Sequence, residues 1–470
     1  MGFVGRTREL HALEDELAKV RRTGSGSFVW LTGRRRVGKS TLVERFLETA
    51  DAPSAFFRAP RRGPDEALRR FASTLAESSL SVAPAVGEGL APDSWVAALR
   101  LAAQGATKSR PAILVIDELP YLIEQDPGFD ADLQEAWDRH LQGAPVLLIA
   151  VGSDAAMMAA LLDAGHALHG RPTRELPVHP FSPAELAELT GMGPAAALDA
   201  YMVVGGFPTL ATTWRDGWSR PRYLAAALAD SYTHFVVNGE RILGGELAGH
   251  EQARLVLEAV GHGERTYTAI RSASGVTSDT SLSNALKLLD LKRLLASASP
   301  YAAPPSRKSR RYTVADPYLR FWLRFVGGSI DELDRGRSDL VLDRVERGWP
   351  AYRGRAIEPL ARAAVERLLP DPRFGAARYV GGFWTRSNDV EVDLVGADAP
   401  DPRAVAFVGS IKWRERKRFD RSDTRELVRQ RAAVPGAEDA LLVGVSRAGF
   451  ARDHGLDVAL TPADLLDAWR

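Results

Sequence analysis

The sequence predicts an α/β protein in which a parallel sheet comes first, helical segments follow, and a second α/β region ends the chain. Residues 1–180 alternate apolar runs of strand length with longer helical patterns, as in a parallel sheet covered on both faces. Residues 181–325 are mostly helical in pattern, and strand-length apolar runs return after residue 376. At about 150 residues per domain, a chain of 470 residues is expected to hold three or four domains.

Composition and charge restrict the chemistry to local sites. The chain holds 61 Lys and Arg residues against 60 Asp and Glu residues, so no overall field would attract nucleic acid or an anionic membrane. It has no cysteine, which excludes disulfides, thiolate zinc sites and cysteine nucleophiles. The amino terminus lacks the apolar core of a signal peptide, and no run of about 18 apolar residues could span a bilayer. We therefore expect a cytoplasmic protein that does not contact a membrane.

The first apolar run, FVWLTG, leads into a glycine-rich loop with the sequence GRRRVGKST. The loop residues are Gly33, Arg34, Arg35, Arg36, Val37, Gly38, Lys39, Ser40 and Thr41. The two glycines allow successive backbone N–H groups to face one anion, and the positive end of the next helix lies at the same place. Lys39 would reach the β and γ phosphates of a nucleotide, and the Ser40 hydroxyl would bind Mg²⁺.

A chance glycine-rich turn before a helix is the alternative interpretation of this segment. Strand, loop and helix occur here in the order that a phosphate-binding loop requires. The sequence therefore predicts binding of ATP, and of its product ADP, together with Mg²⁺.

A second apolar run, ILVIDE, ends in the carboxylates Asp117 and Glu118. Asp117 would hold Mg²⁺ through water, and Glu118 would polarise the water that attacks the γ-phosphate. An acidic pair at a strand end can also be a solvated turn, but the loop upstream favours the nucleotide site. Because an adjacent carboxylate favours hydrolysis over binding alone, we predict an ATPase with Glu118 and Lys39 as catalytic residues.

The third clear strand, PVLLIAVG, is followed directly by Ser153. A polar residue at this strand tip would lie beside the γ-phosphate and sense its presence. The alternative is that Ser153 caps the helix that begins near Ala155. Near the amino terminus, the segment FVGRTREL precedes an amphipathic helical pattern and would present its backbone to an adenine.

The middle of the chain is predicted to hold two helical domains. In residues 181–243, the break at 204–208 separates packed helices, because Gly and Pro disfavour helix interiors. Residues 244–325 show helical segments, then a basic turn and a strand, which is the order of a winged helix. The basic turn contains Arg307, Lys308, Arg310 and Arg311.

The third helix of this winged-helix pattern, residues 280–291, would enter a DNA major groove, while the basic turn would contact phosphate. Its basic residues are few, namely Lys287 and the adjoining Lys292 and Arg293. A module that only packs against other domains is an equal alternative.

A charged linker, residues 326–345, is expected to lead into a last domain, residues 346–470, of different architecture. A helix at 353–368 and strand-like runs beginning at 377, 390 and 404 predict an α/β fold.

Three residues of this last domain, Glu358, Asp393 and Lys412, are predicted to converge as a metal-dependent site that cleaves phosphodiesters. The carboxylates would bind Mg²⁺, and the lysine would stabilise the attacking water or the transition-state charge. Residues 412–431 hold nine basic and four acidic side chains. They would form either a DNA-contacting face or a solvated charged helix.

Taken in order, several motifs make the chain resemble the archaeal-type ATPase family, in the AAA+/STAND branch of P-loop proteins. They are FVGRTREL, GRRRVGKSTL, VIDELPYL, VGSDAAMM, the Gly170-Arg171 step before LPVHPFSPAEL, GGFP and YTVADPYLRFWLRFV. Members of this family carry a carboxy-terminal domain of unknown function that resembles the PD-(D/E)XK nuclease fold. The resemblance implies a P-loop NTPase parallel sheet (1–180) with a helical lid (181–243), a winged helix (244–325) and an α/β nuclease-like domain (346–470).

The resemblance also implies two residue roles. Pro208 belongs to the lid motif, residues 206–208, that closes over the nucleotide base. Arg171 is similar to the arginine that senses the γ-phosphate, and whether it would act in its own subunit or across a subunit interface is open.

One position departs from the nuclease-like pattern. The pattern has an acidic residue two positions before the lysine, whereas this chain has Ser410 before Lys412. Serine is a poor Mg²⁺ ligand compared with a carboxylate, although Glu391 or Glu358 could supply the charge from another position. We therefore expect a degenerate binding module here rather than an active nuclease.

Two functions remain open from the sequence. In the first, an ATPase uses its nucleotide state to control a DNA-associated output formed by the winged helix and the nuclease-like domain. In the second, a STAND-like nucleotide-gated switch or scaffold binds a protein partner without nucleic acid. The oligomeric state and the physiological target are not predicted.

Overall fold

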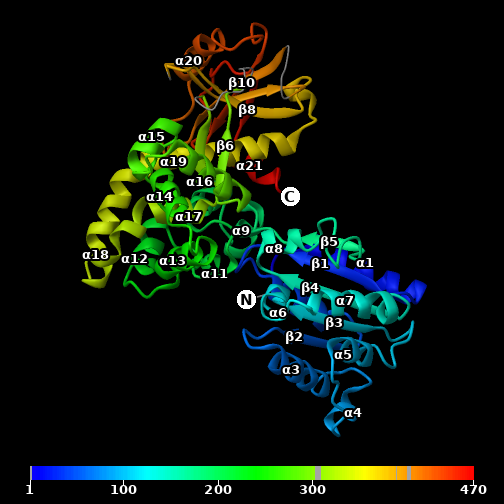
Figure 1. The fold of residues 1–470 in the computed structure, drawn as a ribbon. Helices are drawn as coiled ribbons and strands as arrows, with labels where there is room; N and C mark the ends of the chain where they lie inside the picture. The colour runs from blue at the N-terminus through cyan, green and yellow to red at the C-terminus, as the bar shows by residue number, and fades with distance from the viewer. Residues whose placement is uncertain (1–2, 302–308, 388, 400–403) are drawn as a thin grey trace. The chain divides into compact units, whose positions relative to one another are not determined.

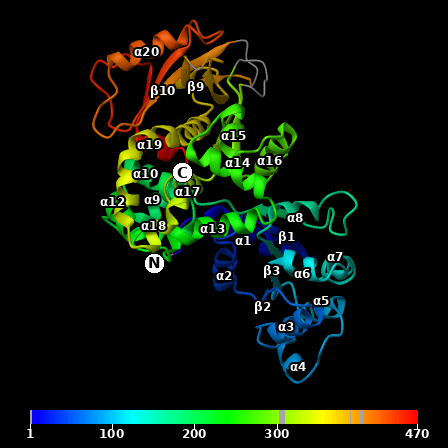
Figure 2. The same cartoon turned by 60° about the vertical axis from the view of Figure 1, so that its left-hand side comes forward.

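The computed structural model describes residues 3–301, 309–387, 389–399 and 404–470. The chain divides into two compact units, an amino-terminal unit of residues 1–180 and a carboxy-terminal unit of residues 181–470. Figures 1 and 2 trace the chain from its amino terminus in blue to its carboxy terminus in red. Each hydrophobic core formed by the described residues lies within one unit or the other, so each unit has its own packing.

The amino-terminal unit is built on a five-stranded parallel sheet with the strand order β2-β3-β4-β1-β5. The strands are β1 (Ser27–Thr32), β2 (Ser54–Arg58), β3 (Ala112–Asp117), β4 (Val146–Gly152) and β5 (Arg174–Pro177). The runs FVWLTG, AILVIDEL and PVLLIAVG form β1, β3 and β4, which confirms the predicted parallel sheet. The short edge strands β2 and β5 are additional to the predicted ones.

Helices cover both faces of this sheet (Figure 1). They are α1 (Thr7–Thr23), α2 (Lys39–Thr49), α3 (Pro64–Ala76), α4 (Ala83–Gly87), α5 (Trp95–Ala102), α6 (Leu119–Gln125), α7 (Phe129–Ala136), the π-helical turn η1 (Trp137–Leu141) and α8 (Ala155–Ala160). Side chains alternate along β1, as a strand requires. Phe28 and Trp30 enter a core with α3, α5 and α7, whereas Val29 and Leu31 enter a core with α1 and α2.

The first part of the carboxy-terminal unit is helical, as predicted. Its helices are α9 (Pro183–Thr190), α10 (Pro194–Val204), α11 (Pro208–Ala211), α12 (Arg220–Ala227) and α13 (His234–Glu246). The predicted break lies between α10 and α11, where Gly205 adopts a positive φ of 60° and Pro208 begins the next helix. The Phe181 backbone N–H donates to the Gly206 carbonyl at 2.8 Å, which ties this break to the start of the unit.

Three helices and a hairpin follow in the order of a winged helix. The helices are α14 (Glu251–His262), α15 (Tyr267–Ser274) and α16 (Asp279–Leu291), and the hairpin pairs β6 (Leu295–Ala298) with β7 (Arg311–Val314) in antiparallel register. The third helix begins one residue before its predicted start, with the Ser278 side chain as its cap. Arg307 and Lys308 of the predicted basic turn lie outside the described residues.

The segment expected to be a linker, residues 326–345, is largely helical. It contains the 3-10 turn η2 (Gly327–Ser329), α18 (Ile330–Asp334) and the start of α19 (Ser338–Leu368), all of which follow α17 (Pro317–Phe325). Val341 and Val345 of α19 are fully buried. The charges of this segment therefore cover the outer face of an amphipathic helix that packs on the unit, and α19 continues without a break into the last domain.

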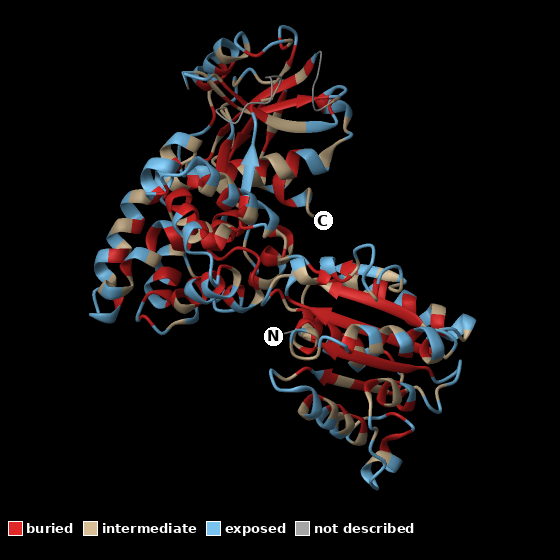
Figure 3. Cartoon of the chain, in the orientation of Figure 1, coloured by how far each residue is buried: buried red, intermediate tan, exposed pale blue. Residues whose placement is uncertain are grey.

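The last domain contains a mixed five-stranded sheet with the order β12-β11-β10-β9-β8. Its strands are β8 (Tyr379–Trp384), β9 (Glu391–Ala397), β10 (Val405–Lys412), β11 (Leu441–Ser446) and β12 (Val458–Leu460). The 3-10 turn η3 (Pro372–Phe374) and the helices α20 (Arg421–Arg431) and α21 (Pro462–Asp467) complete it. Figure 3 shows that the buried residues concentrate in the strands of both large sheets. Among the described residues, no helix is long and apolar enough to cross a membrane.

Candidate functional site

The glycine-rich loop lies where β1 ends, at the carboxyl edge of the parallel sheet. Gly38 adopts a left-handed φ of 90° and caps α2, which begins at Lys39. At Gly33, an added Cβ would lie 2.4 Å from the carbonyl oxygen of Val178, so only glycine fits at that approach. The two glycines therefore shape a loop whose helix points its positive end at the space above the strand.

Lys39 lies within the curve of this loop. Its ammonium donates to the carbonyl oxygens of Gly33 at 2.8 Å and Arg34 at 3.0 Å. The residue is only 6% exposed. A lysine charge is thus fixed beside the backbone N–H groups that would surround a phosphate.

The structure brings Ser40 and Asp117 into direct contact. The Ser40 hydroxyl on α2 donates to Asp117 Oδ2, at the end of β3, over 2.9 Å. Asp117 is 2% exposed. One hydroxyl oxygen and one carboxylate therefore meet next to the glycine-rich loop, as the two sequence motifs predict.

Glu118 and Ser153 form a second contact at the same sheet edge. The Ser153 hydroxyl donates to Glu118 Oε2 at 2.7 Å. Glu118 has a left-handed backbone with a φ of 60°, an uncommon conformation for a non-glycine residue that is often found at functional sites. The alternative that Ser153 caps the following helix is wrong, because the Asp154 side chain accepts from the Met157 N–H and caps α8.

Arg6, from the segment FVGRTREL, also contacts the glycine-rich loop. Its guanidinium donates to the Val37 carbonyl at 2.8 Å and pairs with Glu9 at 3.1 Å. Arg6 is 4% exposed and has a left-handed φ of 60°. The segment therefore supports the backbone of the loop, a role that sequence reasoning missed, while its contact with an adenine stays a prediction.

Arg58 is a second residue that sequence reasoning missed. It ends β2 directly opposite Asp117 in the strand register, and its Nε donates to Asp117 Oδ2 at 3.0 Å. The carboxylate oxygen that accepts from Ser40 thus also accepts from a guanidinium. The signal available in the sequence was the short run SAFFR, which ends in an arginine but is too short to be recognised as a strand by its pattern.

Further arginines gather around Tyr121 near this edge of the sheet. Arg35 of the loop donates to the Tyr121 hydroxyl at 3.0 Å, and the Arg61 guanidinium lies 4.1 Å from the centre of the Tyr121 ring. The second contact has the geometry of a cation–π interaction. One arginine of the loop, Arg35, is therefore anchored by helix α6 of the same unit.

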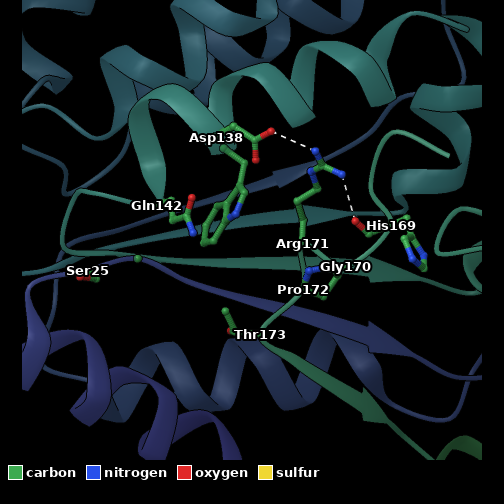
Figure 4. A pocket seen from close by; sticks show the side chains of 10 residues that line it. Ser25, Asp138, Gln142, His169, Gly170, Arg171, Pro172 and Thr173 are labelled. Carbon is green, nitrogen blue, oxygen red and sulfur yellow. Dashed lines mark hydrogen bonds and ion pairs between the residues drawn. The ribbon is translucent and has the colours of Figure 1, made fainter. Parts of the chain in front are cut away.

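Arg171 lies at the opposite edge of the sheet. It lines a pocket of about 580 Å³ with Ser25 and Gly26, which precede β1. Figure 4 shows its side chain directed to Asp138, 3.1 Å away, and to the His169 carbonyl, 2.9 Å away. At about 3.3 Å per residue, β1 separates this edge from the glycine-rich loop by roughly 17 Å. A γ-phosphate in the same subunit is therefore out of reach of Arg171, and action across a subunit interface stays a prediction.

The predicted nuclease-like residues are neighbours, but the protein itself occupies their charges. The Glu358 carboxylate on α19 lies 3.4 Å from the Arg362 guanidinium and 3.6 Å from that of Arg265. Lys412 instead lies 3.9 Å from the Glu426 carboxylate on α20. Lysine and glutamate are thus engaged in separate ion pairs.

Asp393 accepts hydrogen bonds from its own sheet. Its Oδ2 accepts from the Ile411 N–H at 2.7 Å and from the Ser410 hydroxyl at 3.3 Å. Burial, and then the nearby Glu358 charge, raise the pKa of Asp393 to about 6, although the Ile411 N–H and Lys412 act in the opposite direction. No group of three or more His, Asp or Glu side chains that could hold a metal occurs in the described part of the chain. This donor set, with one carboxylate bound to two guanidiniums, does not fit a Mg²⁺ site.

Glu391, which could have replaced the missing carboxylate, is engaged elsewhere. It pairs with Arg311 of the winged-helix hairpin, and the Arg311 guanidinium lies 4.4 Å from the centre of the Trp384 ring. The Trp384 indole N–H donates to the Ser309 carbonyl at 2.7 Å. Arg311 is 7% exposed, so it packs on the last domain. The sequence predicts instead that its charge contacts DNA phosphate.

Two family models match the chain. Residues 3–210 match the model of an ATPase domain found predominantly in Archaea. Residues 3–210 therefore resemble archaeal-type ATPase domains. Downstream of it, residues 322–426 match a family of archaeal and bacterial proteins of unknown function. The family resemblance predicted from the motifs is confirmed for both segments.

Individual proteins resemble the chain over most of its length. An uncharacterized protein of Methanocaldococcus jannaschii is 25% identical over 447 residues, which are 93% of each chain. Among solved structures, a Walker-type ATPase of Pyrococcus abyssi aligns with a TM-score of 0.48 and 17% identity, covering 68% of this chain and 96% of its own. The ORC2 protein of Aeropyrum pernix, in ADPNP–ADP complexes, aligns with a TM-score of 0.46 and 15% identity over 73% of this chain and 95% of its own.

Proposed function

We propose that the archaeal-type ATPase domain binds ATP together with Mg²⁺ and hydrolyses it. The observation that carries this proposal is the 2.9 Å hydrogen bond between Ser40 and Asp117 beside the loop that holds Lys39. Two motifs that lie far apart in the sequence thus meet at one point, which supports a shared role in nucleotide hydrolysis.

The residues at this point fit a magnesium ion. Mg²⁺ prefers oxygen ligands and is bound by one or two protein oxygens plus phosphates and water, and the Ser40 hydroxyl and Asp117 carboxylate supply such oxygens. When bound, the ion would neutralise charge on the phosphates. We infer that Ser40 and Asp117 hold it.

The remaining residues would divide the chemistry among them. Lys39 would contact the β and γ phosphates with the backbone N–H groups of residues 33–41. Glu118 would orient the attacking water and take up its proton, and the hydrogen bond from Ser153 would fix the Glu118 carboxylate for that task. If the Ser153 hydroxyl also contacted the γ-phosphate, its hydrogen bonding would change as the phosphate leaves.

We further propose that the nucleotide state controls the last domain through the lid. The lid motif, residues 206–208, directly follows α10, and Asp199 on this helix contacts the last domain. Its carboxylate accepts from the Trp413 indole N–H at 2.8 Å and from the Arg447 Nε at 2.9 Å. A movement of the lid over the base, with Pro208 in contact, would thus be passed on to the carboxy-terminal sheet.

DNA is the partner that this output would contact in the leading proposal. Lys287 and Arg293 lie exposed on and just after α16, and Arg421, Arg425 and Arg429 are exposed along α20. Rows of exposed arginine suit phosphate contacts that carry no sequence information. The basic stretch 412–431 is only partly available, since Lys412, Arg414 and Lys417 are paired with Glu426, Asp423 and Asp420.

A protein-binding switch without nucleic acid is the second candidate function. The packing of Arg311 on Trp384 and the pairing of Glu358 with two guanidiniums favour it. These contacts remove two of the elements expected to act on DNA. In this case the same ATP site would gate a surface for a protein partner.

ATP turnover by the purified chain, with and without double-stranded DNA at low and moderate salt, would test these proposals. Stimulated turnover and DNA retention that falls steeply with salt would support the DNA-associated output, because phosphate contacts release counterions. Replacing Arg421, Arg425 and Arg429 by Gln should then abolish the stimulation.

A matched loss of charge at Arg69, Arg70 and Arg100, which are exposed on α3 and α5, should leave the stimulation intact. ATP turnover that is the same with and without DNA would favour the protein-binding switch. The absence of any turnover would contradict the ATPase proposal itself. The same reactions run on a gel should show uncut DNA, since the cluster around Asp393 does not fit a metal.

A further inference from the structure

Arg58 places a permanent positive charge at the proposed magnesium site. Its Nε donates to Asp117 Oδ2 at 3.0 Å, and the same oxygen accepts from the Ser40 hydroxyl at 2.9 Å. Both groups that would hold the metal are therefore engaged with each other and with a guanidinium. Arginine does not lose its proton in proteins, so this charge cannot be removed by titration.

A magnesium ion held by Ser40 and Asp117 would lie next to this guanidinium. Two cations that share one carboxylate oxygen repel each other, and the repulsion is stronger when that carboxylate is buried, as Asp117 is at 2% exposed. One of the two cations must then leave Asp117. Arg58 can move away, because its side chain is 60% exposed. The Asp117 carboxylate cannot easily turn away, because it is packed at the end of β3.

Glu44 supplies a second acceptor for the same guanidinium. This residue lies on α2, one helical turn after Ser40, and its carboxylate is 3.9 Å from Arg58 Nη2. Its side chain is 55% exposed. Arg58 thus stands between two carboxylates, with a short contact to the buried one and a longer contact to the exposed one.

We propose that Arg58 is a two-position cation that holds Asp117 before the metal arrives and transfers to Glu44 when Mg²⁺ binds with nucleotide. This inference rests on the proposed nucleotide function of the site. The transfer keeps the guanidinium paired in both positions. The magnesium affinity then depends on the difference in free energy between the Arg58–Asp117 and Arg58–Glu44 contacts. Arg58 acts here as a positioning residue.

The proposal predicts shifts of opposite sign for two variants. Removing the competing charge in Arg58→Ala should lower the Mg²⁺ concentration for half-maximal binding of a fluorescent ADP by about fivefold, the size expected for loss of an ion pair whose arginine is exposed. Removing the alternative acceptor in Glu44→Gln should raise it by about twofold, because an exposed ion pair contributes little. Arg58→Lys, which keeps the charge, should stay near the parental value.

The measurement is a Mg²⁺ titration of fluorescent ADP binding by the full chain, repeated in EDTA. In EDTA, Arg58→Ala should bind as the parent does, because the competition concerns only the metal. Arg62→Ala, which removes an exposed arginine from the loop after β2, should not shift the Mg²⁺ titration. Circular dichroism would establish that each variant is folded.

The outcomes separate this inference from the proposed function. If the parent binds fluorescent ADP in a manner that needs both Lys39 and Mg²⁺, but Arg58→Ala and Glu44→Gln titrate like the parent, the transfer of Arg58 is contradicted and the nucleotide site stands. A shift of the same sign in both variants also contradicts it. If the parent binds no nucleotide, the proposed function itself fails.

Discussion

The molecule holds two clusters of carboxylate, lysine and arginine, and their charges are paired in different ways. In the ATPase domain, Asp117 and Ser40 meet beside Lys39 and Glu118 is held separately by Ser153. In the last domain, Glu358 is bound by two guanidiniums and Asp393 by its own sheet. The residue types are similar in both clusters. The difference is that Asp117, which also accepts from one exposed arginine, lies beside the glycine-rich loop, whereas Glu358 lies between two guanidiniums with no such loop beside it.

Among the changes that test this comparison, loss of Lys39 should have the largest effect on ATP binding. Lys39→Ala removes the charge that lies inside the glycine-rich loop, and we expect ATP affinity to fall by roughly 100-fold, the size expected for loss of a charged hydrogen-bond donor. Equilibrium binding of a fluorescent ATP measures this. The matched variant Lys19→Ala, on α1, should bind as the parent does, and an unchanged affinity in Lys39→Ala would remove the loop from the ATP site.

Glu118→Gln should separate binding from turnover. The amide keeps the size of the side chain but cannot take up a proton from water, so we expect the turnover number to fall by about 100-fold or more while ATP affinity stays within about twofold. Steady-state hydrolysis and binding assays measure the two quantities. Glu124→Gln on the neighbouring helix α6, where the residue is exposed, is the control. Hydrolysis at the parental rate would show that another group orients the water.

Asp199→Ala should test whether the two regions can communicate through the lid. The change leaves the Trp413 indole N–H and the Arg447 charge without their shared acceptor, and we expect a loss of about 2–3 kcal/mol in the stability of the carboxy-terminal unit. Urea unfolding and limited proteolysis measure it, with the exposed Asp216→Ala as control. If DNA still changed ATP turnover in the folded variant as it does in the parent, the coupling path through Asp199 would be disproved.

The smallest effect concerns the pH dependence of the cluster around Asp393. Burial raises its folded-state pKa from 3.8 to about 6, so the folded chain binds this proton more tightly than the unfolded chain. The stability linked to that proton is full below about pH 4 and is lost as the pH rises through 6. Asp393→Asn is neutral throughout, so its melting temperature relative to the parent should rise between pH 4 and 7, by the equivalent of about 1–2 kcal/mol.

Melting curves at several pH values would check this sign, with the exposed Asp439→Asn as control. A difference that does not change with pH would mean that Asp393 is ionised in the folded chain throughout this range. The cluster would then resemble the ATP site more closely than its contacts indicate.

The sequence predicts the central strands and places Ser40 and Asp117 at one magnesium site, because those features are local or follow from the parallel order of strands. It could not predict Arg58, since the pairing of β2 with β3 brings together residues that no short motif connects. The family resemblance gives Arg171 a role at the γ-phosphate, and the position of β5 beside β1, which sets Arg171 at the far edge of its own sheet, leaves that role to action across a subunit interface. Residues 326–345 differ from the predicted linker for another reason. Their charge density favours a linker, although the buried Val341 and Val345 keep a helical spacing.

The place of β1 in the sheet has a consequence for the newly synthesised chain. This strand ends at Thr32, but its two neighbours, β4 and β5, begin only at Val146 and Arg174. While the ribosome is making the first half of the ATPase domain, β1 has no partner strand, and its apolar residues must stay unpaired or be shielded by chaperones. ATP could therefore help this domain to fold only after residue 177 has been made, so a ribosome stalled earlier should carry a chain that ATP does not protect from protease.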